Sequence, residues 1–269
     1  MAFSYSKISA AMGLSTVLLL SACSNSEAPK NNTLTASTPA TGEASNLSER
    51  NAEQRLIHTL EAHFKLANIP AKILEIKPTE VPKMYWVNLE GMGAVYASAD
   101  GKYIFQGDII RLGEKSLHNV SKELQADVNK RHFEQLKSED LLIYKAKGKT
   151  KYVIYVFTDT SCPYCHKFHE QMDEMNRKGI EVRYIAWPRG EDFIPTMESV
   201  WCSEDRHAAF DLAIQDQPLA PATCQNPVRD QYQLGINIGV NGTPAIYNDQ
   251  GQYLGGYLST TELIKHLDN

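Results

Sequence analysis

Two cysteines separated by two residues have the clearest chemistry in this sequence. Cys162 and Cys165 enclose Pro163 and Tyr164, and two thiols one helical turn apart are close enough to form a disulfide. If Pro163 is the first helical residue, Cys162 is the N-cap, where free backbone N–H groups and the helix dipole favour a thiolate. We therefore predict that Cys162 is a nucleophile and that Cys165 is the thiol that resolves its mixed disulfides.

Other interpretations of the same residues are open. Cys162-Pro-Tyr-Cys165-His166 also fits covalent attachment of a c-type haem. Cys162, Cys165, His166 and His169 have zinc-compatible spacing, although four ligands within two turns of one helix rarely surround a metal tetrahedrally. A purely structural disulfide here would close too few residues to stabilise the protein much. We expect no metal site and no cofactor.

Charge close to the cysteines allows two further interpretations. His166 and Lys167 follow Cys165 directly, and positive side chains stabilise a nearby thiolate. A solvated surface position explains both residues equally well.

The elements around the motif form a predicted βαβ unit. Tyr152–Phe157 is an apolar, β-branched run typical of a strand buried on both faces of a sheet. A helix is predicted over 163–178, ended by Gly179, and a second strand over Ile180–Ala186. The motif is thus placed where a buried strand meets a helix.

The C-terminal part continues this domain. Strands are predicted at Ala245–Tyr247 and 252–254 around the turn 249–251, and Ser259 with Glu262 predicts a capping box for a last helix. The segment from about 190 to 235 has helical patterning and interrupts the βαβ pattern as an insertion. The three tryptophans are predicted to be core residues: Trp86, Trp187 and Trp201.

A smaller α+β module precedes this domain. A helix is predicted from about Glu49, with Leu56, Leu60 and Phe64 on one face, and Pro70 ends it. Four short strands follow, at 71–76, 84–89, 92–98 and 102–106. With some 60 residues the module would be marginally stable alone, which indicates pairing with a second copy. A connecting helix with a narrow apolar stripe is predicted over 116–139.

The N-terminus predicts export. Lys7 precedes an apolar run, Ile8–Leu20, of the length of a signal-peptide core. Leu20-Ser21-Ala22-Cys23 resembles a bacterial lipobox, so residues 1–22 would be removed and Cys23 acylated. Residues 23–48, rich in small and polar side chains, are predicted to be a flexible tether. The membrane is then reached by a lipid anchor only.

Composition sets limits on function and domain count. The chain has 269 residues, of which 42% are hydrophobic, and a net charge of −5. It lacks the basic excess that a nucleic-acid phosphate backbone requires. Three folded parts are predicted: a module at 49–110, a linker at 111–140, and a domain at 141–269.

Several segments together resemble the DsbC/DsbG family of periplasmic thiol-disulfide isomerases from about residue 50 to the C-terminus. They are Phe157-Thr158-Asp159, the run from Cys162 to Lys167, Gly239 to Ala245, and Val95 to Asp108. The resemblance implies an α/β thioredoxin-like catalytic domain with a helical insertion, preceded by a small α+β, cystatin-like dimerisation domain and a linker helix. The Pro-Tyr dipeptide of the motif is as in DsbG-like members.

The same resemblance implies roles for further residues. It places Thr243 before a cis proline, Pro244, in a loop that lies against the active-site cysteines. Such a loop can pair with an extended substrate backbone, so Thr243 and Pro244, with Pro163 and Tyr164, are substrate-binding candidates. Cys202 and Cys224 are implied to pair as a structural disulfide, whose loop would stabilise the fold by about 3 kcal/mol.

The function implied by this resemblance is reshuffling of wrong disulfides in misfolded envelope proteins. The resemblance also implies a homodimer and a DsbD-type membrane reductant as partner. The expected location is the periplasm, with Ser24 after the lipidated cysteine favouring the outer membrane. Two alternatives are a dimeric holdase chaperone, in which the cysteines are incidental, and a c-type haem electron-transfer protein.

Overall fold

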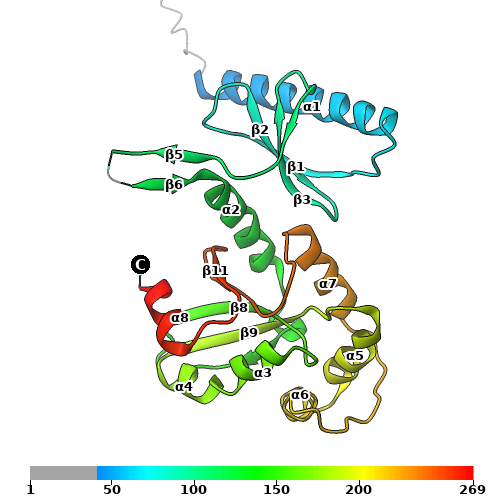
Figure 1. Cartoon of the computed structure of the whole chain (residues 1–269), viewed down its shortest axis with the longest axis vertical. Helices are drawn as coiled ribbons and strands as arrows, with labels where there is room; N and C mark the ends of the chain where they lie inside the picture. Colours follow the sequence, from blue (N-terminus) through cyan, green and yellow to red (C-terminus); the bar gives the residue numbers. More distant parts are fainter. Residues whose placement is uncertain (1–40, 115, 269) are drawn as a thin grey trace, which may run out of the picture. The chain divides into compact units, whose positions relative to one another are not determined.

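The computed structural model describes residues 41–114 and 116–268, with side chains from residue 49 (Figure 1). Residues 1–40, which contain the predicted signal peptide and Cys23, lie outside the described residues. The described part contains two main sheets, and each has its own hydrophobic core. No helix among the described residues has both the length and the apolar character that a membrane span requires.

The first helix is longer than predicted. α1 (Thr41–Leu66) begins ahead of Glu49 and covers the end of the segment that we expected to be a tether. Extending an existing helix costs far less than nucleating one, so polar composition alone did not mark its start. Its predicted apolar face is confirmed, because Leu56, Leu60 and Phe64 are buried.

A four-stranded antiparallel sheet packs against α1. Its strands are β1 (Ile73–Pro78), β2 (Met84–Leu89), β3 (Gly93–Ser98) and β4 (Ile104–Phe105), in that spatial order. A turn at Asp100-Gly101 joins β3 to β4, and Gly101 has a φ of +68°. A Cβ at this glycine would lie 2.7 Å from Cγ2 of Thr59 on α1, so the turn requires glycine twice over.

The segment after the sheet differs from the prediction. A hairpin forms from β5 (Ile110–Leu112) and β6 (Leu117–Asn119), and only then does α2 (Val120–Gln135) begin. The side chain of Asn119 caps α2 by accepting from the backbone N–H of Lys122. The predicted helix over 116–139 is therefore too long at both ends.

The linker helix α2 packs against residues of both sheets. Val128 packs with Trp86 and Tyr96 of the first sheet, whereas the Phe133 ring stacks on Tyr155 at 4.5 Å between centroids. Val120, Leu124 and Val128 recur every four residues as a narrow apolar stripe, and Phe133 lies outside this repeat.

The C-terminal domain is built on a five-stranded sheet with the order β11-β10-β8-β9-β7. The predicted βαβ unit is confirmed: β8 (Tyr152–Thr158) and β9 (Ile180–Ala186) are parallel neighbours. The other strands pair antiparallel, and they are β7 (Leu142–Tyr144), β10 (Ala245–Asn248) and β11 (Tyr253–Gly255).

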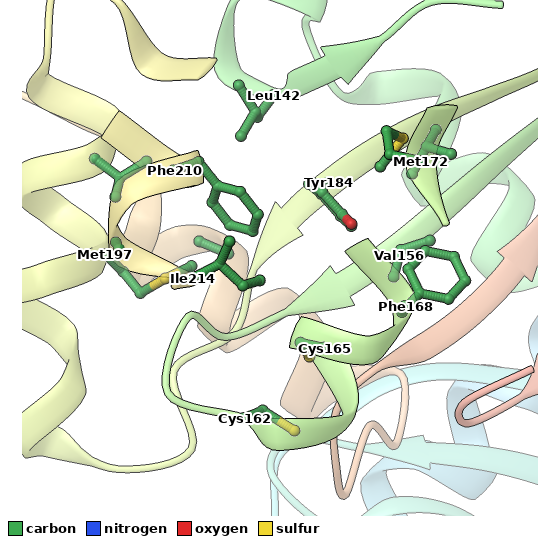
Figure 2. Close-up of a cluster of buried hydrophobic side chains, with 14 of the residues drawn as sticks. Leu142, Val156, Cys162, Cys165, Phe168, Met172, Tyr184, Met197, Phe210 and Ile214 are labelled. Carbon is green, nitrogen blue, oxygen red and sulfur yellow. The ribbon is translucent and has the colours of Figure 1, made fainter. Parts of the chain in front are cut away.

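Alternate residues of β8 supply the cores on the two faces of this sheet. Ile154 and Val156 join a cluster that includes both cysteines of the motif (Figure 2). Tyr155 and Phe157 join a second cluster with Phe133. A continuous apolar strand was therefore the correct prediction, since neither face of β8 is exposed to solvent.

Two short helices replace the single helix predicted over 163–178. α3 (Pro163–His169) ends at Glu170, and α4 (Met172–Arg177) begins after Gln171. The Oε1 atom of Gln171 accepts hydrogen bonds from the backbone N–H of Thr260 at 2.8 Å and from its hydroxyl at 3.2 Å. This contact is with the first residue of α8 (Thr260–Leu267), so a tertiary interaction holds the break. The predicted capping box of Ser259 and Glu262 is present.

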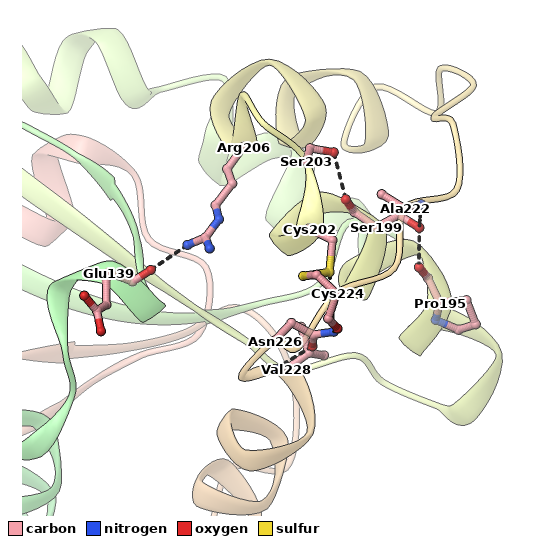
Figure 3. Close-up of a disulfide and its surroundings, with 10 residues drawn as sticks. All are labelled: Glu139, Pro195, Ser199, Cys202, Ser203, Arg206, Ala222, Cys224, Asn226 and Val228. Atoms are coloured by element: carbon pink, nitrogen blue, oxygen red, sulfur yellow. Dashed lines mark hydrogen bonds between the residues drawn. A yellow bond between two sulfur atoms is a disulfide. The ribbon is translucent and has the colours of Figure 1, made fainter.

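The insertion is helical, as predicted, and a disulfide joins two of its segments (Figure 3). It contains α5 (Ile194–Cys202), α6 (Arg206–Ala213) and α7 (Val228–Asn237), and a short 3-10 turn at Glu191–Phe193 comes before α5. Another 3-10 turn, outside the insertion, lies at Ser138–Asp140 ahead of β7. Cys202 and Cys224 are bonded, with their Cα atoms 5.5 Å apart. The bond ties the end of α5 to the irregular segment before α7. The three tryptophans are buried, as expected.

Candidate active site

The two cysteines of the motif occupy the first turn of α3. Cys162 is the N-cap, with φ −90° and ψ 118°, and Pro163 is in the first turn. The Cys162 carbonyl accepts from the backbone N–H groups of Cys165, at 2.9 Å, and His166, at 3.1 Å. The N-cap position predicted from Pro163 is confirmed.

A second loop meets the motif from far along the sequence. Thr243-Pro244 is a cis peptide bond, and the Cys162 thiol donates to the Thr243 carbonyl oxygen at 3.1 Å. The Thr243 hydroxyl is buried and has no hydrogen-bond partner of its own. When Cys162 is ionised, this hydroxyl can donate to its sulfur. The loop position that the resemblance implied for Thr243 and Pro244 is therefore observed.

The environment of Cys162 favours its thiolate. Its pKa is lowered to about 5, chiefly by hydrogen bonding from Cys165, with further help from Thr243 and from the backbone N–H groups of Cys165 and Tyr164; burial opposes the shift. The sulfur is also almost fully covered, since Cys162 is 2% exposed. At neutral pH the thiol is thus ionised, although very little of the residue is exposed to solvent.

Cys165 has the opposite environment. Burial raises its pKa, and the neighbouring Cys162 raises it further. The residue is 1% exposed and lies in the hydrophobic cluster with Phe168 and Val156 (Figure 2). Cys165 therefore keeps its proton and donates it toward Cys162. The pair is thus a thiolate at the N-cap of α3 and a protonated thiol one turn further into the helix.

An ion pair fixes the loop that precedes Cys162. Asp159 is fully buried, and its carboxylate accepts from the backbone N–H and the Nε of Arg189, at 2.9 and 3.1 Å. The same carboxylate accepts from the backbone N–H and hydroxyl of Ser161. Arg189 also donates to the Ser161 carbonyl at 2.6 Å. We name these three residues the loop clamp.

The histidines after the motif have structural contacts. His166 Nε2 lies 2.6 Å from the Thr160 carbonyl oxygen, so it carries the proton. Both ring nitrogens of His169 are also occupied, by the Tyr184 hydroxyl at 3.2 Å and the Asp211 carboxylate at 2.9 Å. Lys167 lies over the Tyr164 ring, 5.5 Å from its centre.

These contacts argue against the metal and haem interpretations. His169 is held by Asp211 and Tyr184, away from the cysteines, and the described residues contain no group of three or more potential ligands arranged for a metal ion. Covalent haem attachment uses both cysteines, whereas Cys165 is packed inside the core. The dithiol interpretation agrees best with the geometry.

Sequence reasoning missed part of this site. Asp159 was named only as part of a segment that resembles the family, and Arg189 was not a predicted site residue. Their contact joins two loops 30 residues apart, so no local pattern indicates it. Tyr253 and Tyr257 were missed as well, although both line a pocket beside Thr243 and Pro244. Asp159 followed by Ser161 at the end of a strand was the one local signal, since this spacing is typical of a side-chain-capped turn.

Comparisons with known proteins agree with this geometry. A thioredoxin-like domain matches residues 139–269, and the N-terminal domain of disulfide bond isomerase proteins matches residues 43–122. The thiol:disulfide interchange protein DsbC of Dickeya dadantii is 40% identical over 197 residues, covering 72% of this chain and 80% of the relative. This chain belongs to the DsbC family. The predicted family and thioredoxin-like fold are thereby confirmed.

Two other DsbC proteins show similar identity. That of Escherichia coli K12 is 38% identical over 208 residues, covering 76% of this chain and 84% of the relative. That of Pasteurella multocida is 39% identical over 178 residues, covering 65% of this chain and 76% of the relative. The likeness thus includes both the module and the C-terminal domain of this DsbC-family protein.

Proposed function

We propose that this protein is a disulfide isomerase and reductase that reshuffles wrong disulfides in proteins of the bacterial envelope. The unequal pair of cysteines carries the proposal: Cys162 has a pKa of about 5, whereas burial keeps Cys165 protonated. A nucleophile must be ionised, and a resolving thiol must wait until a mixed disulfide exists. The catalytic roles of Cys162 and Cys165 are part of this proposal.

The reaction begins at Cys162. Its thiolate attacks one sulfur of a client disulfide, the client S–S bond breaks, and the second client sulfur leaves as a thiolate. Another client thiolate then attacks the client sulfur bound to Cys162 and releases the Cys162 thiolate. A different client disulfide has formed, and no electrons have been transferred overall.

The second outcome is reduction of the client. Cys165 loses its proton and attacks the Cys162 sulfur, the client leaves as a thiolate, and Cys162 and Cys165 form a disulfide. The client gains two electrons, and the protein must recover them. A membrane reductant of the DsbD type is the partner that we propose for this step.

The loop of Thr243 and Pro244 is proposed to hold the client. The Thr243 carbonyl faces Cys162 at 3.1 Å, so an extended client segment at Cys162 would lie along this loop. Pro163 and Tyr164, between the cysteines, form the other side of the contact, and Tyr164 is 57% exposed.

A homodimer is proposed for the assembly. β4 is one of the two edge strands of its sheet, and its residues Ile104 and Phe105 are exposed. The β5–β6 hairpin exposes Ile110, Leu112 and Leu117. Exposed apolar edges of this kind favour pairing with another chain, and the matching N-terminal domain agrees with a paired module.

The location is proposed from the N-terminal sequence. An exported protein with acylated Cys23 would be held in the periplasm on the outer membrane, and its single odd cysteine would be accounted for. Mass spectrometry of the purified envelope protein tests this: acyl chains on Cys23 are expected, and an unmodified N-terminus at another residue would contradict the anchor.

The decisive experiment compares two activities of one variant. Cys162→Ala should abolish reactivation of scrambled ribonuclease, because no other described thiol is placed to start the exchange. Suppression of aggregation of an unfolded protein should survive. If Cys162→Ala still reactivates scrambled ribonuclease, the isomerase proposal is wrong and the alternative of a holdase chaperone is favoured.

A further inference from the structure

A pocket of about 280 Å³ lies beside the cis peptide bond. Three tyrosines form much of its wall: Tyr164 of α3, Tyr253 of β11, and Tyr257 in the segment before α8. They are 57%, 52% and 39% exposed. None of the residues that line the pocket is charged. The wall is therefore aromatic and partly open to solvent.

The tyrosine rings are held in a fixed arrangement. Tyr164 and Tyr257 have ring centroids 6.0 Å apart at an interplanar angle of 42°, within the range of favourable aromatic pairs. The Nε2 atom of Gln171 donates to the Tyr257 hydroxyl at 3.4 Å. Tyr253 packs on the buried Tyr247 at 5.2 Å between centroids. Each of the three rings thus has a contact that restricts its position.

Two glycines leave space between these rings. A Cβ built at Gly242 would meet no atom within 4 Å, and one built at Gly256 would meet only the Pro244 carbonyl oxygen, at 3.6 Å. Neither glycine has the positive φ that would itself require glycine. The space therefore depends on both residues being glycine, and a larger side chain at either position would fill it.

The pocket is lined by the loop that also contacts the reacting sulfur. Thr243 and Pro244 line the pocket, and the Thr243 carbonyl is 3.1 Å from the Cys162 sulfur. An extended peptide advances roughly 3.3 Å per residue. A client whose cysteine is bonded to Cys162 therefore brings a side chain one or two residues away into the pocket.

We propose that this pocket binds a large apolar side chain of the client, aromatic for preference, one or two residues from its reacting cysteine. The inference rests on the proposed function, since it names the clients that Cys162 attacks fastest. Rings stack favourably on tyrosine. A charged side chain would lose hydration in a pocket whose lining residues are all uncharged. The pocket thus selects among client disulfides by their neighbouring residues.

A second cavity offers a matched comparison. It has about 370 Å³ and is lined by Thr160 and Ser161, which precede Cys162 in the sequence, and by the exposed ring of Phe193. Asp216 also lines it, so an apolar side chain would meet a carboxylate there. We therefore assign the apolar side chain to the tyrosine pocket.

The test measures formation of mixed disulfides by the full-length Cys165→Ser protein, which cannot resolve them. Peptides with one cysteine activated as a mixed disulfide with thionitrobenzoate carry Phe, Leu, Gly or Asp one or two residues from that cysteine. Attack by Cys162 forms a Cys162–peptide disulfide and releases thionitrobenzoate, whose absorbance gives the rate. The Phe peptide should react about tenfold faster than the Gly peptide, and the Asp peptide no faster than the Gly peptide.

Three substitutions test whether the preference for the Phe peptide arises in the tyrosine pocket. Tyr257→Ala removes part of the wall and Gly256→Leu fills the pocket, and each should reduce the Phe-to-Gly ratio to below about threefold. Phe193→Ala, the matched change in the second cavity, should leave it unchanged. A small aliphatic disulfide, which has no ring for the pocket to bind, should react at the same rate with every variant, which reports that Cys162 is intact.

Two outcomes would overturn the inference. One is a Phe-to-Gly ratio near one in the parent protein; the other is a ratio that falls with Phe193→Ala and not with the pocket variants. Reactivation of scrambled ribonuclease by the wild-type protein is measured in parallel. If it succeeds while the peptides show no preference, the pocket inference fails and the proposed function stands.

Discussion

At Cys162, ionisation depends first on the neighbouring Cys165 thiol, whose hydrogen bond is the largest cause of its low pKa. The two residues cannot ionise independently, because a thiolate on one raises the cost of a second negative charge beside it. One proton shared between two sulfurs therefore sets the reactivity of the whole site.

Alkylation of the reduced protein across a range of pH tests this dependence. The rate at Cys162 should rise with a midpoint near pH 5, and Cys165→Ala should move the midpoint up by about one unit or more, because the main donor is lost. Cys165→Ser keeps a donor and should move it less. A midpoint near 8.5, the value for an unperturbed thiol, would refute the nucleophile assignment.

The same shift gives the pH dependence of stability a definite sign. Between about pH 5 and 8.5 the folded reduced protein has Cys162 ionised, while the unfolded chain holds the proton there. The free energy of unfolding of the reduced protein should therefore rise with pH across this window, relative to the oxidised protein. Paired denaturant titrations of the two redox forms measure the difference.

The residue types predicted the chemistry of the site, but they did not predict the contacts that hold the site in place. Pro163 after Cys162 was enough to place the N-cap, since proline is best tolerated in the first turn. The loop clamp was not predictable, because Asp159 and Arg189 meet only after β8 and β9 have paired. Nor did any local pattern mark Tyr257, whose role depends on where α3 and β11 lie.

Among the elements, the linker helix carries a test of its own. Phe133 is 2% exposed and packs between Tyr155, Phe157 and Tyr247. Phe133→Ala should lower the free energy of unfolding of the C-terminal domain by about 3–5 kcal/mol. Denaturant unfolding followed by circular dichroism measures this.

A control on the same helix separates packing from helix propensity. Glu134→Ala, at an exposed position whose carboxylate pairs only with Lys130 among the described residues, should change the free energy of unfolding by less than about 0.5 kcal/mol. Equal effects of the two substitutions would contradict the packing of α2 on the C-terminal domain.

The hairpin and the helix break were predicted wrongly because neither follows from a local pattern of buried apolar residues. The β5–β6 hairpin has exposed Ile110, Leu112 and Leu117, so its apolar residues do not show the burial pattern from which strands are inferred. The break between α3 and α4 contains neither proline nor glycine, and it is held by the hydrogen bond from Thr260, at the start of α8, to Gln171. By contrast, β2 and β9 have the predicted bounds, since their patterns follow directly from burial.

For the whole molecule, the proposed homodimer makes a prediction that the isolated site does not. Leu112→Lys combined with Leu117→Lys places two charges on the exposed hairpin and should give a monomer, because a buried lysine without a partner opposes association. Sedimentation measures the mass. Attack on a small disulfide should stay within about twofold, while reactivation of scrambled ribonuclease should fall about fivefold or more.

Leu66→Lys is the matched control, because Leu66 is 82% exposed and lies at the end of α1, outside the hairpin. It should leave both the mass and the reactivation unchanged. A double variant that is monomeric and still reactivates scrambled ribonuclease at the full rate would show that a second copy is not needed for isomerisation.

The loop clamp has a consequence for how the protein works in both directions. The side chains of Asp159, Ser161 and Arg189 bond to one another and to the backbone of the clamp, and none of these side-chain bonds involves either sulfur. The loop can therefore keep one shape while the cysteines pass from dithiol to mixed disulfide to disulfide. Bond exchange then requires little reorganisation of the backbone, so the forward and reverse barriers fall together. A disulfide isomerase needs this reversibility, because each wrong disulfide that it helps to form must also be broken.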